Sequence, residues 1–150
     1  MSLLLSRVIF PRESRDFAGK RYISIGLRTL HLMGIAGFAG FFLFALPIEI
    51  WRPFAILAVS SGIALIGVEI FSDGIWLLQL RGLAVILKLL ILAMSFTFPD
   101  LTLFGFFIII ALSGFFSHAP AKIRYYSPFI GKVVKSSSEL ALHHEGRKNA

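Results

Sequence analysis

The chain has 150 residues, of which 57% are hydrophobic, and its mean hydropathy is +0.83. Soluble domains average about 45–50% apolar residues, so the composition predicts an integral membrane protein. The chain contains no cysteine, which excludes disulfides, thiolate metal ligands and a thiol nucleophile. The formal net charge of +7 would suggest nucleic acid in a soluble protein. Because the basic residues here flank apolar stretches, we expect anionic lipid headgroups as their partner, and no nucleic acid.

Four apolar stretches follow one another with short connections, and each is close to the ~20 residues that a helix needs to cross a bilayer. Breaks are expected at Pro47, at residues 72–74 and at Pro99, and Pro53 is expected to open the second helix. The sequence therefore predicts an all-α polytopic membrane protein, a four-helix transmembrane bundle with short loops. Its expected spans cover about residues 28–46, 53–71, 75–98 and 101–117.

Basic residues are concentrated before the first span and after the last, whereas Arg52 is the base in the connections opposite. The positive-inside rule then predicts a multi-pass protein of the bacterial inner (cytoplasmic) membrane with both termini in the cytoplasm. We expect a basic arm at residues 1–22, either interfacial or disordered, a transmembrane domain at 23–118 and a basic cytoplasmic tail at 119–150. From Ser136 onward the tail is expected to be loosely ordered.

Small residues are expected to mark the contacts between helices, because helices in lipid associate by close packing. The spans contain such residues at Gly34, Ala58, Gly62 and Gly114. The phenylalanines of the first and fourth spans are expected to face lipid or a partner; these are Phe38, Phe41, Phe42, Phe44, Phe104, Phe106 and Phe107.

Charged residues gather near the cytoplasmic ends of the spans, where each is expensive and invites a functional interpretation. A structural charge cluster is predicted from Arg28, Glu69, Asp73 and Arg81. In this interpretation Glu69 pairs with Arg81, Asp73 pairs with Arg28, and both pairs fix the register of the helices.

Lys88 lies near mid-membrane, about two turns beyond Arg81. The sequence places no carboxylate at that depth. We therefore expect a carbonyl, a water, an acid from another subunit or an anionic cofactor group beside the ammonium, although the side chain can also lean toward the cytoplasmic face.

His31 and His118 lie on different helices in one leaflet, which is the minimum for bis-imidazole ligation of haem b. With Arg81 and Lys88 nearby, the chain loosely resembles four-helix membrane cytochromes of the b type. That resemblance implies that His31 and His118 ligate the haem iron and that Arg81 and Lys88 neutralise the propionates. The alternative is that both histidines are hydrogen-bonding groups at the ends of their helices.

Residues 117–127 end the last helix and then alternate basic and aromatic side chains. Lys122 and Arg124 suit headgroup phosphates, and Tyr125 and Tyr126 suit the membrane interface; a docking strip for a partner is the alternative. The segment resembles the end of small uncharacterised four-helix bacterial inner-membrane proteins.

No nucleophile, paired-acid, metal-ligand or phosphate-loop spacing stands out in the sequence, so the chain is not expected to be an enzyme by itself. The leading hypothesis is an accessory or assembly subunit of a larger inner-membrane complex, such as a respiratory or other redox enzyme, with bound lipids. The alternatives are a haem b-binding electron-transfer subunit that uses His31 and His118, and an oligomeric small transporter or channel.

Overall fold

The computed structural model describes residue 11 and residues 14–139, and this part of the chain is mostly helical. Its elements, in order, are α2 (Lys20–Phe44), α3 (Ile48–Ser72), η1 (Gly74–Leu78), α4 (Leu80–Thr97), η2 (Pro99–Leu101), α5 (Thr102–His118), α6 (Ala121–Arg124), β1 (Tyr126–Ser127) and β2 (Lys132–Val133). Within the described residues, four helical stretches are long and apolar enough to cross a membrane, namely α2, α3, α4 and η2 with α5. Residues 1–10 and 12–13 of the expected basic arm lie outside the described residues.

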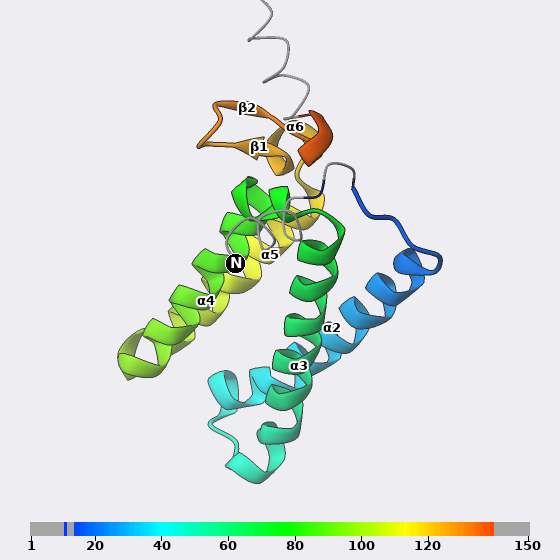
Figure 1. The fold of residues 1–150 in the computed structure, drawn as a ribbon. Helices are drawn as coiled ribbons and strands as arrows, with labels where there is room; N and C mark the ends of the chain where they lie inside the picture. The colour runs from blue at the N-terminus through cyan, green and yellow to red at the C-terminus, as the bar shows by residue number, and fades with distance from the viewer. Residues whose placement is uncertain (1–10, 12–13, 140–150) are drawn as a thin grey trace, which may run out of the picture.

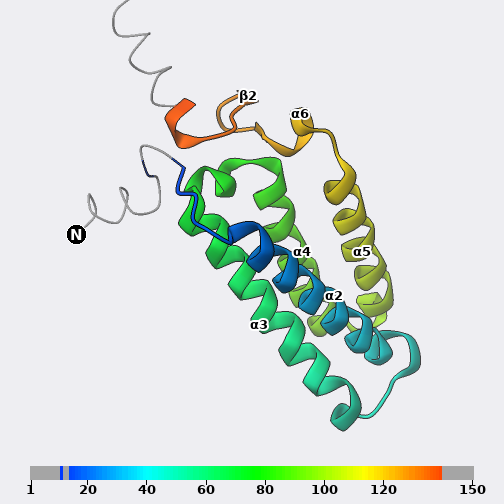
Figure 2. The ribbon, with the colours of Figure 1, turned by 90° about the vertical axis from the view of Figure 1, so that its right-hand side faces the viewer.

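The long helices form antiparallel hairpins. α2 packs along α3, and α4 packs along α5 (Figures 1 and 2). Contacts between the hairpins are fewer and come mainly from α2 against α5 and from η1, which packs against both α3 and α4. The α2–α3 and α4–α5 connections lie at one end of the helices, which we name the far end, and β1, β2 and α6 lie at the other (Figure 1).

The first two helices are longer than expected. α2 begins at Lys20, directly after Gly19, whose φ of 84° is left-handed. The basic residues Lys20, Arg21 and Arg28 therefore lie within the helix, whereas Lys20 and Arg21 were expected to precede it. α3 begins at Ile48 with Pro47 as its N-cap, and Pro53 lies inside the helix. The prediction that Pro53 opens this helix was therefore wrong. Pro53 is the sixth residue of α3, and because proline has no N–H, the helix lacks the hydrogen bond that residue 53 would otherwise donate to the carbonyl of Glu49.

The third helix starts later than expected, because the chain first makes the 3₁₀ helix η1. The carboxylate of Asp73 accepts a hydrogen bond from the backbone N–H of Ile75 at 3.1 Å and so caps this segment. Gln79 is then extended, and α4 begins at Leu80. At Gly82 a Cβ atom would overlap the carbonyl oxygen of Trp76, so η1 can fold back closely on α4 only because residue 82 is glycine.

The fourth helix agrees with its predicted bounds to within one residue. η2 and α5 follow α4 after a short turn, and Thr102 Oγ1 donates a hydrogen bond to the carbonyl of Ser95 at 2.7 Å. The side chain of Ser95 packs directly on Gly105, where a Cβ would overlap it. Small residues thus bring α4 and α5 together.

Small residues also form the contact between α2 and α3, as predicted. A Cβ atom on Gly34 would lie 2.5 Å from the backbone nitrogen of Ala58, and a Cβ on Gly62 would lie 3.0 Å from the His31 ring. Gly114 differs, because no atom lies within 4 Å of the Cβ that a side chain would add there.

Several phenylalanines do not face outward as expected, because they form an aromatic cluster that joins helices. Phe42 of α2 stacks on Phe106 of α5 with ring centroids 4.4 Å apart, and Trp51 of α3 contacts Phe41 at 5.0 Å. Phe106 is only 5% exposed. The outward expectation does hold for Phe104, which is 67% exposed, and also for Phe44 and Phe107.

Residues 119–139 fold over one end of the helices; we name them the C-terminal cap, and the end that they cover the capped end. β1 pairs antiparallel with β2, and the N–H of Val134 donates to the carbonyl of Tyr125 at 2.9 Å. Val134 is 1% exposed. The sequence predicted only a basic tail here, so the order of this segment was missed.

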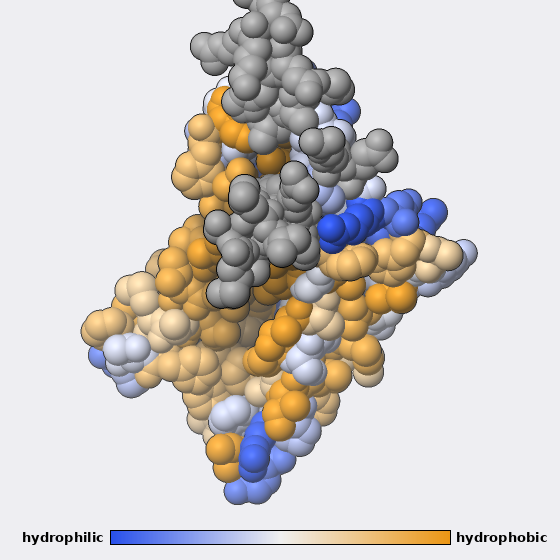
Figure 3. All heavy atoms as spheres, in the orientation of Figure 1, coloured by the Kyte–Doolittle hydropathy of each residue, from blue (hydrophilic) through white to orange (hydrophobic). Residues whose placement is uncertain are grey.

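The sides of the long helices are apolar and largely uncovered. On the face seen in Figure 3, hydrophobic residues cover most of the helix surface and the most hydrophilic residues lie toward the ends of the helices. In each candidate span only 11–17% of the most apolar window is buried within the chain. This distribution is that of a multi-pass membrane protein, whose side surfaces face lipid or other membrane helices.

Candidate functional site

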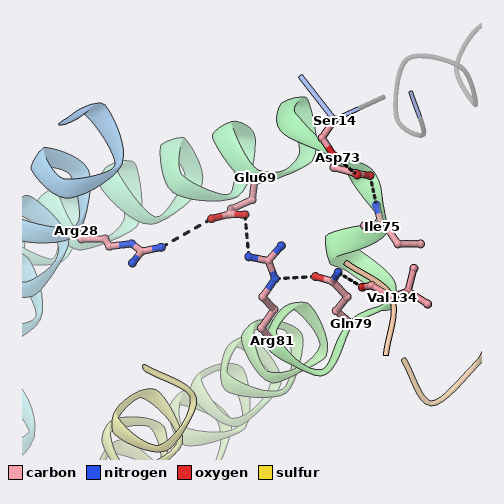
Figure 4. Close-up of polar contacts among 8 residues, drawn as sticks. All are labelled: Ser14, Arg28, Glu69, Asp73, Ile75, Gln79, Arg81 and Val134. Carbon is pink, nitrogen blue, oxygen red and sulfur yellow. Dashed lines mark hydrogen bonds and ion pairs between the residues drawn. The ribbon is translucent and has the colours of Figure 1, made fainter. Parts of the chain in front are cut away.

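The polar side chains of the helices meet at the capped end, around Glu69. This residue of α3 lies between two bases, with its Oε2 atom 3.4 Å from Nη1 of Arg81 and its Oε1 atom 3.8 Å from Nη2 of Arg28 (Figure 4). The Glu69 and Arg81 side chains are 22% and 26% exposed, whereas Arg28 is 67% exposed. The predicted Glu69–Arg81 pair is confirmed, and it joins the α2–α3 hairpin to the α4–α5 hairpin.

Arg81 is held by more than its acid. Its Nε atom donates to Oε1 of Gln79 at 2.6 Å, and Nε2 of Gln79 donates to the carbonyl of Val134 at 2.7 Å (Figure 4). Its guanidinium also lies over the ring of Tyr125, 4.9 Å from the centroid, in cation–π geometry. A continuous polar network therefore runs from α2 through α3 and α4 to the C-terminal cap.

Asp73 belongs to a second polar centre, so the predicted Asp73–Arg28 pair was wrong. The Asp73 carboxylate accepts hydrogen bonds from Ser14 Oγ at 2.9 Å and from the backbone N–H of Ser137 at 2.8 Å, besides that from Ile75. The Ser137 hydroxyl donates to it as well. Asp73 is only 7% exposed, and a buried carboxylate needs such donors. Asp73 therefore joins the α3–η1 turn to Ser14, which precedes α2 in the sequence, and to Ser137, which follows α5.

Lys88 of α4 is half-buried, and its Nζ atom donates a hydrogen bond to Oγ of Ser113 on α5 at 3.1 Å. Ser113 in turn donates to the carbonyl of Ile109 at 2.8 Å. Among the described residues, no carboxylate lies within ion-pair distance of Lys88. The sequence led us to expect a carbonyl, a water, an acid from another subunit or an anionic cofactor group beside Lys88; the serine hydroxyl that the fold provides was not among these.

The structure does not bring His31 and His118 together. His31 lies about three turns into α2, with Nδ1 2.8 Å from the carbonyl of Ala58 and 3.3 Å from Ser61 Oγ. Because a carbonyl only accepts, Nδ1 is the donor in this contact. His118 is the exposed last residue of α5, at the capped end. The two rings therefore lie at different depths, and the reason is that α2 begins well before the expected start of its span.

The basic and aromatic residues after α5 have separate roles in the cap. Lys122 is exposed on α6 and Tyr126 starts β1, while the ring of Tyr125 has Arg124 as well as Arg81 near it, with the Arg124 guanidinium 5.7 Å from the centroid. The Nε atom of Arg124 is buried without a hydrogen-bond partner among the described residues. Tyr125 is thus part of the polar network, and Lys122 is the side chain of this group most open to headgroups.

Gln79, Ser137 and Val134 are parts of this site that the sequence did not reveal. Gln79 is fully buried but carries no charge, and Ser137 lies in a segment that composition alone marks as loose.

Across residues 14–139 no group of three or more His, Asp or Glu side chains could hold a metal ion. A shallow hollow of about 350 Å³ on α3 is lined by Ala55, Ile56, Val59, Ser60 and Ile63, none of them titratable.

The chain matches no protein-family model, no curated protein and no solved structure. Its class is therefore defined by its own fold and site. The described residues form a mostly helical fold with four helices long and apolar enough to cross a membrane, and its polar groups join the helices to one another and to a terminal cap.

Proposed function

We propose that this protein is an accessory or assembly subunit of a larger complex in the bacterial inner membrane, such as a respiratory or other redox enzyme. The observation that carries the proposal is the contrast between its polar and apolar groups. The polar side chains at the capped end bind one another, whereas the long apolar sides remain uncovered.

The polar network supports a structural role rather than catalysis. Glu69 contacts Arg28 and Arg81, Gln79 binds Arg81 and Val134, and the Asp73 carboxylate accepts hydrogen bonds from several donors. A catalytic acid or base must have a free edge toward substrate. These groups are instead used to hold the helices and the cap in register.

The apolar sides support embedding among other membrane components. Large side chains point outward from each long helix, including Leu32 at 66%, Ile63 at 65%, Leu90 at 58% and Phe104 at 67% exposure. Bound lipids can cover part of this surface. The connections between helices are too short to fold as separate domains, so action through the transmembrane surface or through the capped end is favoured.

The charge distribution supports an orientation. Within the described residues, the capped end carries basic residues from the start of α2 and from the segment after α5, among them Lys20, Arg21, Lys122, Lys132 and Lys135. Arg52 lies at the far end. By the positive-inside rule the capped end is cytoplasmic. Anionic headgroups are then the expected neighbours of Lys122.

The alternatives have less support from the geometry. Bis-imidazole haem b needs one iron within reach of both histidines, but His31 binds the Ala58 carbonyl deep in α2 and His118 ends α5. A transporter or channel needs polar groups that line one path through the membrane, whereas the network lies at one end and the deeper polar contacts, His31 with Ser61 and Lys88 with Ser113, belong to different hairpins. We therefore retain the subunit role as the conclusion.

Blue-native electrophoresis of membranes solubilised in digitonin tests the proposal. We expect the tagged chain to migrate in a discrete band well above the mass of its detergent-bound monomer, with at least one other protein in fixed ratio. The same sample in a harsh detergent provides the monomer position as a control. Migration only at the monomer position in every mild detergent would overturn the proposal.

A further inference from the structure

Lys88 lies at the centre of the transmembrane region. It is the ninth residue of the 18-residue helix α4, so at about 1.5 Å per residue it lies about 12 Å from the start and about 14 Å from the end of the helix. A headgroup at the membrane surface is therefore more than a lysine side chain away from the base of this residue. The side chain therefore starts at the depth where an unpaired charge is most expensive, and its ammonium reaches Ser113, five residues before the capped end of α5.

The chain supplies little to balance this charge. The ammonium has three donors, and Ser113 is its one hydrogen-bond partner among the described residues. The acids of the long helices and their connections lie elsewhere. Glu69 and Asp73 are engaged at the capped end, and Glu49 and Asp100 lie at the far end. No described acid of this chain shares the depth of Lys88.

The surface beside Lys88 is open and made of small residues. Ser113, Gly114 and Ser117 lie on one side of α5, and Gly114 and Ser117 are exposed. A Cβ atom added at Gly114 would meet nothing within 4 Å. Small residues let a neighbouring helix approach its partner backbone closely, so a helix lying on α5 here would have its own side chains within reach of Lys88.

We propose that Lys88 binds an aspartate or glutamate side chain at the middle of a transmembrane helix of a different protein subunit. Charge complementarity selects an acid, and the depth of Lys88 selects a membrane-spanning helix. A second copy of this chain is disfavoured because its described acids lie at other depths. The inference rests on the proposed role as a subunit and names the chemistry of the partner at one contact.

The test uses the purified full-length chain in liposomes and synthetic transmembrane peptides of about 23 residues. One Leu/Ala peptide carries a central Glu, a second has Gln at that position, and a third carries the Glu two turns nearer one end. Energy transfer between the labelled chain and each peptide measures association. We expect the central-Glu peptide to bind about threefold to tenfold more tightly than the other two, the range expected for a polar contact between helices in lipid.

Matched variants separate the contact from general effects. Lys88→Met should abolish the preference for the central-Glu peptide, and Lys88→Arg should retain it. Arg52→Met, which removes the same charge at the far end, should leave it unchanged. Gly114→Leu adds a side chain in open space, so it should leave folding intact while weakening association. Equal binding of the three peptides, or a preference that survives in Lys88→Met, would overturn the inference.

This outcome is independent of the test of the proposed function. A peptide preference that depends on Lys88 supports the contact even where the chain is found as a monomer on blue-native gels. Migration in a large complex that is unaltered by Lys88→Met, together with equal peptide binding, would leave the subunit role standing and overturn the role of Lys88.

Discussion

Arg81 of α4 contacts Glu69 of α3 at 3.4 Å, and through this pair the α4–α5 hairpin is fixed to the α2–α3 hairpin at the capped end. The same guanidinium binds Gln79 and lies over the ring of Tyr125, so the C-terminal cap contacts the Glu69–Arg81 pair through Tyr125. Since η1 also packs against both α3 and α4 near this end, Arg81 and η1 together hold the two hairpins here.

Glu69→Ala should lower the free energy of unfolding in detergent by about 1–3 kcal/mol, because it leaves Arg81 without its acid in a partly buried site. Arg28→Ala removes the other base that contacts Glu69. Since Arg28 is 67% exposed, its loss should change stability by less than about 0.5 kcal/mol. Thermal or denaturant unfolding followed by circular dichroism measures both.

The paired variant Glu69→Gln/Arg81→Met gives the internal control. It removes both charges, so it should destabilise the protein less than Glu69→Ala alone. A loss equal to that of the single variant would show that Glu69 and Arg81 do not act as a pair.

Asp73→Ala should release the end of the C-terminal cap, because it removes the acceptor of the backbone and hydroxyl donors of Ser137. We expect faster hydrogen exchange at residues 134–137 and a loss of stability of about 1–3 kcal/mol. Ser117→Ala, which removes a hydroxyl bonded only to the backbone of α5, serves as a control and should leave exchange at these amides unchanged. Unaltered protection in Asp73→Ala would contradict the placement of the cap on the α3–η1 turn.

Gly34→Ala should destabilise the α2–α3 hairpin by about 1–3 kcal/mol, the usual effect of overpacking. Its new Cβ would lie 2.5 Å from the backbone nitrogen of Ala58, so the helices must move apart. Gly26→Ala is a matched control in the same helix, since nothing lies within 4 Å of its Cβ position. It should be neutral or stabilising by up to about 1 kcal/mol through helix propensity. Similar unfolding midpoints for the two variants would argue against close packing at Gly34.

Phe106→Ala should lower stability by at least about 1 kcal/mol, because it removes an aromatic contact between α5 and α2 and leaves a void beside Phe42. Phe104→Ala truncates the same residue type on the same helix at a position that is 67% exposed. It should therefore have little effect in detergent. A larger loss of stability in Phe104→Ala than in Phe106→Ala would contradict the packing of Phe106 between α5 and α2.

The sequence was sufficient for the features that depend on hydropathy and on strong breakers. Apolar runs and Pro99 predicted the α4–α5 turn closely, and the small residues Gly34 and Ala58 were correctly expected at a helix contact. The Glu69–Arg81 pair followed from a short turn between neighbouring antiparallel helices, which brings inward-facing residues on the two helices close together.

The missed features depend on tertiary contacts that no local pattern records. Pro53 was expected to open α3, but Pro47 already ends the preceding turn and α3 begins at Ile48. Asp73 was expected to pair with Arg28; its place at the end of α3 instead directs it to the η1 amides and Ser137. The latter contact joins residues far apart in the chain, so composition alone made the cap look like a loose tail.

Every proposal above requires that the long helices cross the bilayer with the capped end on one side and the far end on the other. The absence of cysteine from the chain allows single-cysteine labelling in intact membranes. Lys135→Cys, at the capped end, should react with a membrane-impermeant maleimide only from the cytoplasmic side. Arg52→Cys and Asp100→Cys, at the far end, should react only from the opposite side. Labelling of all three positions from the same side would contradict the membrane-spanning arrangement.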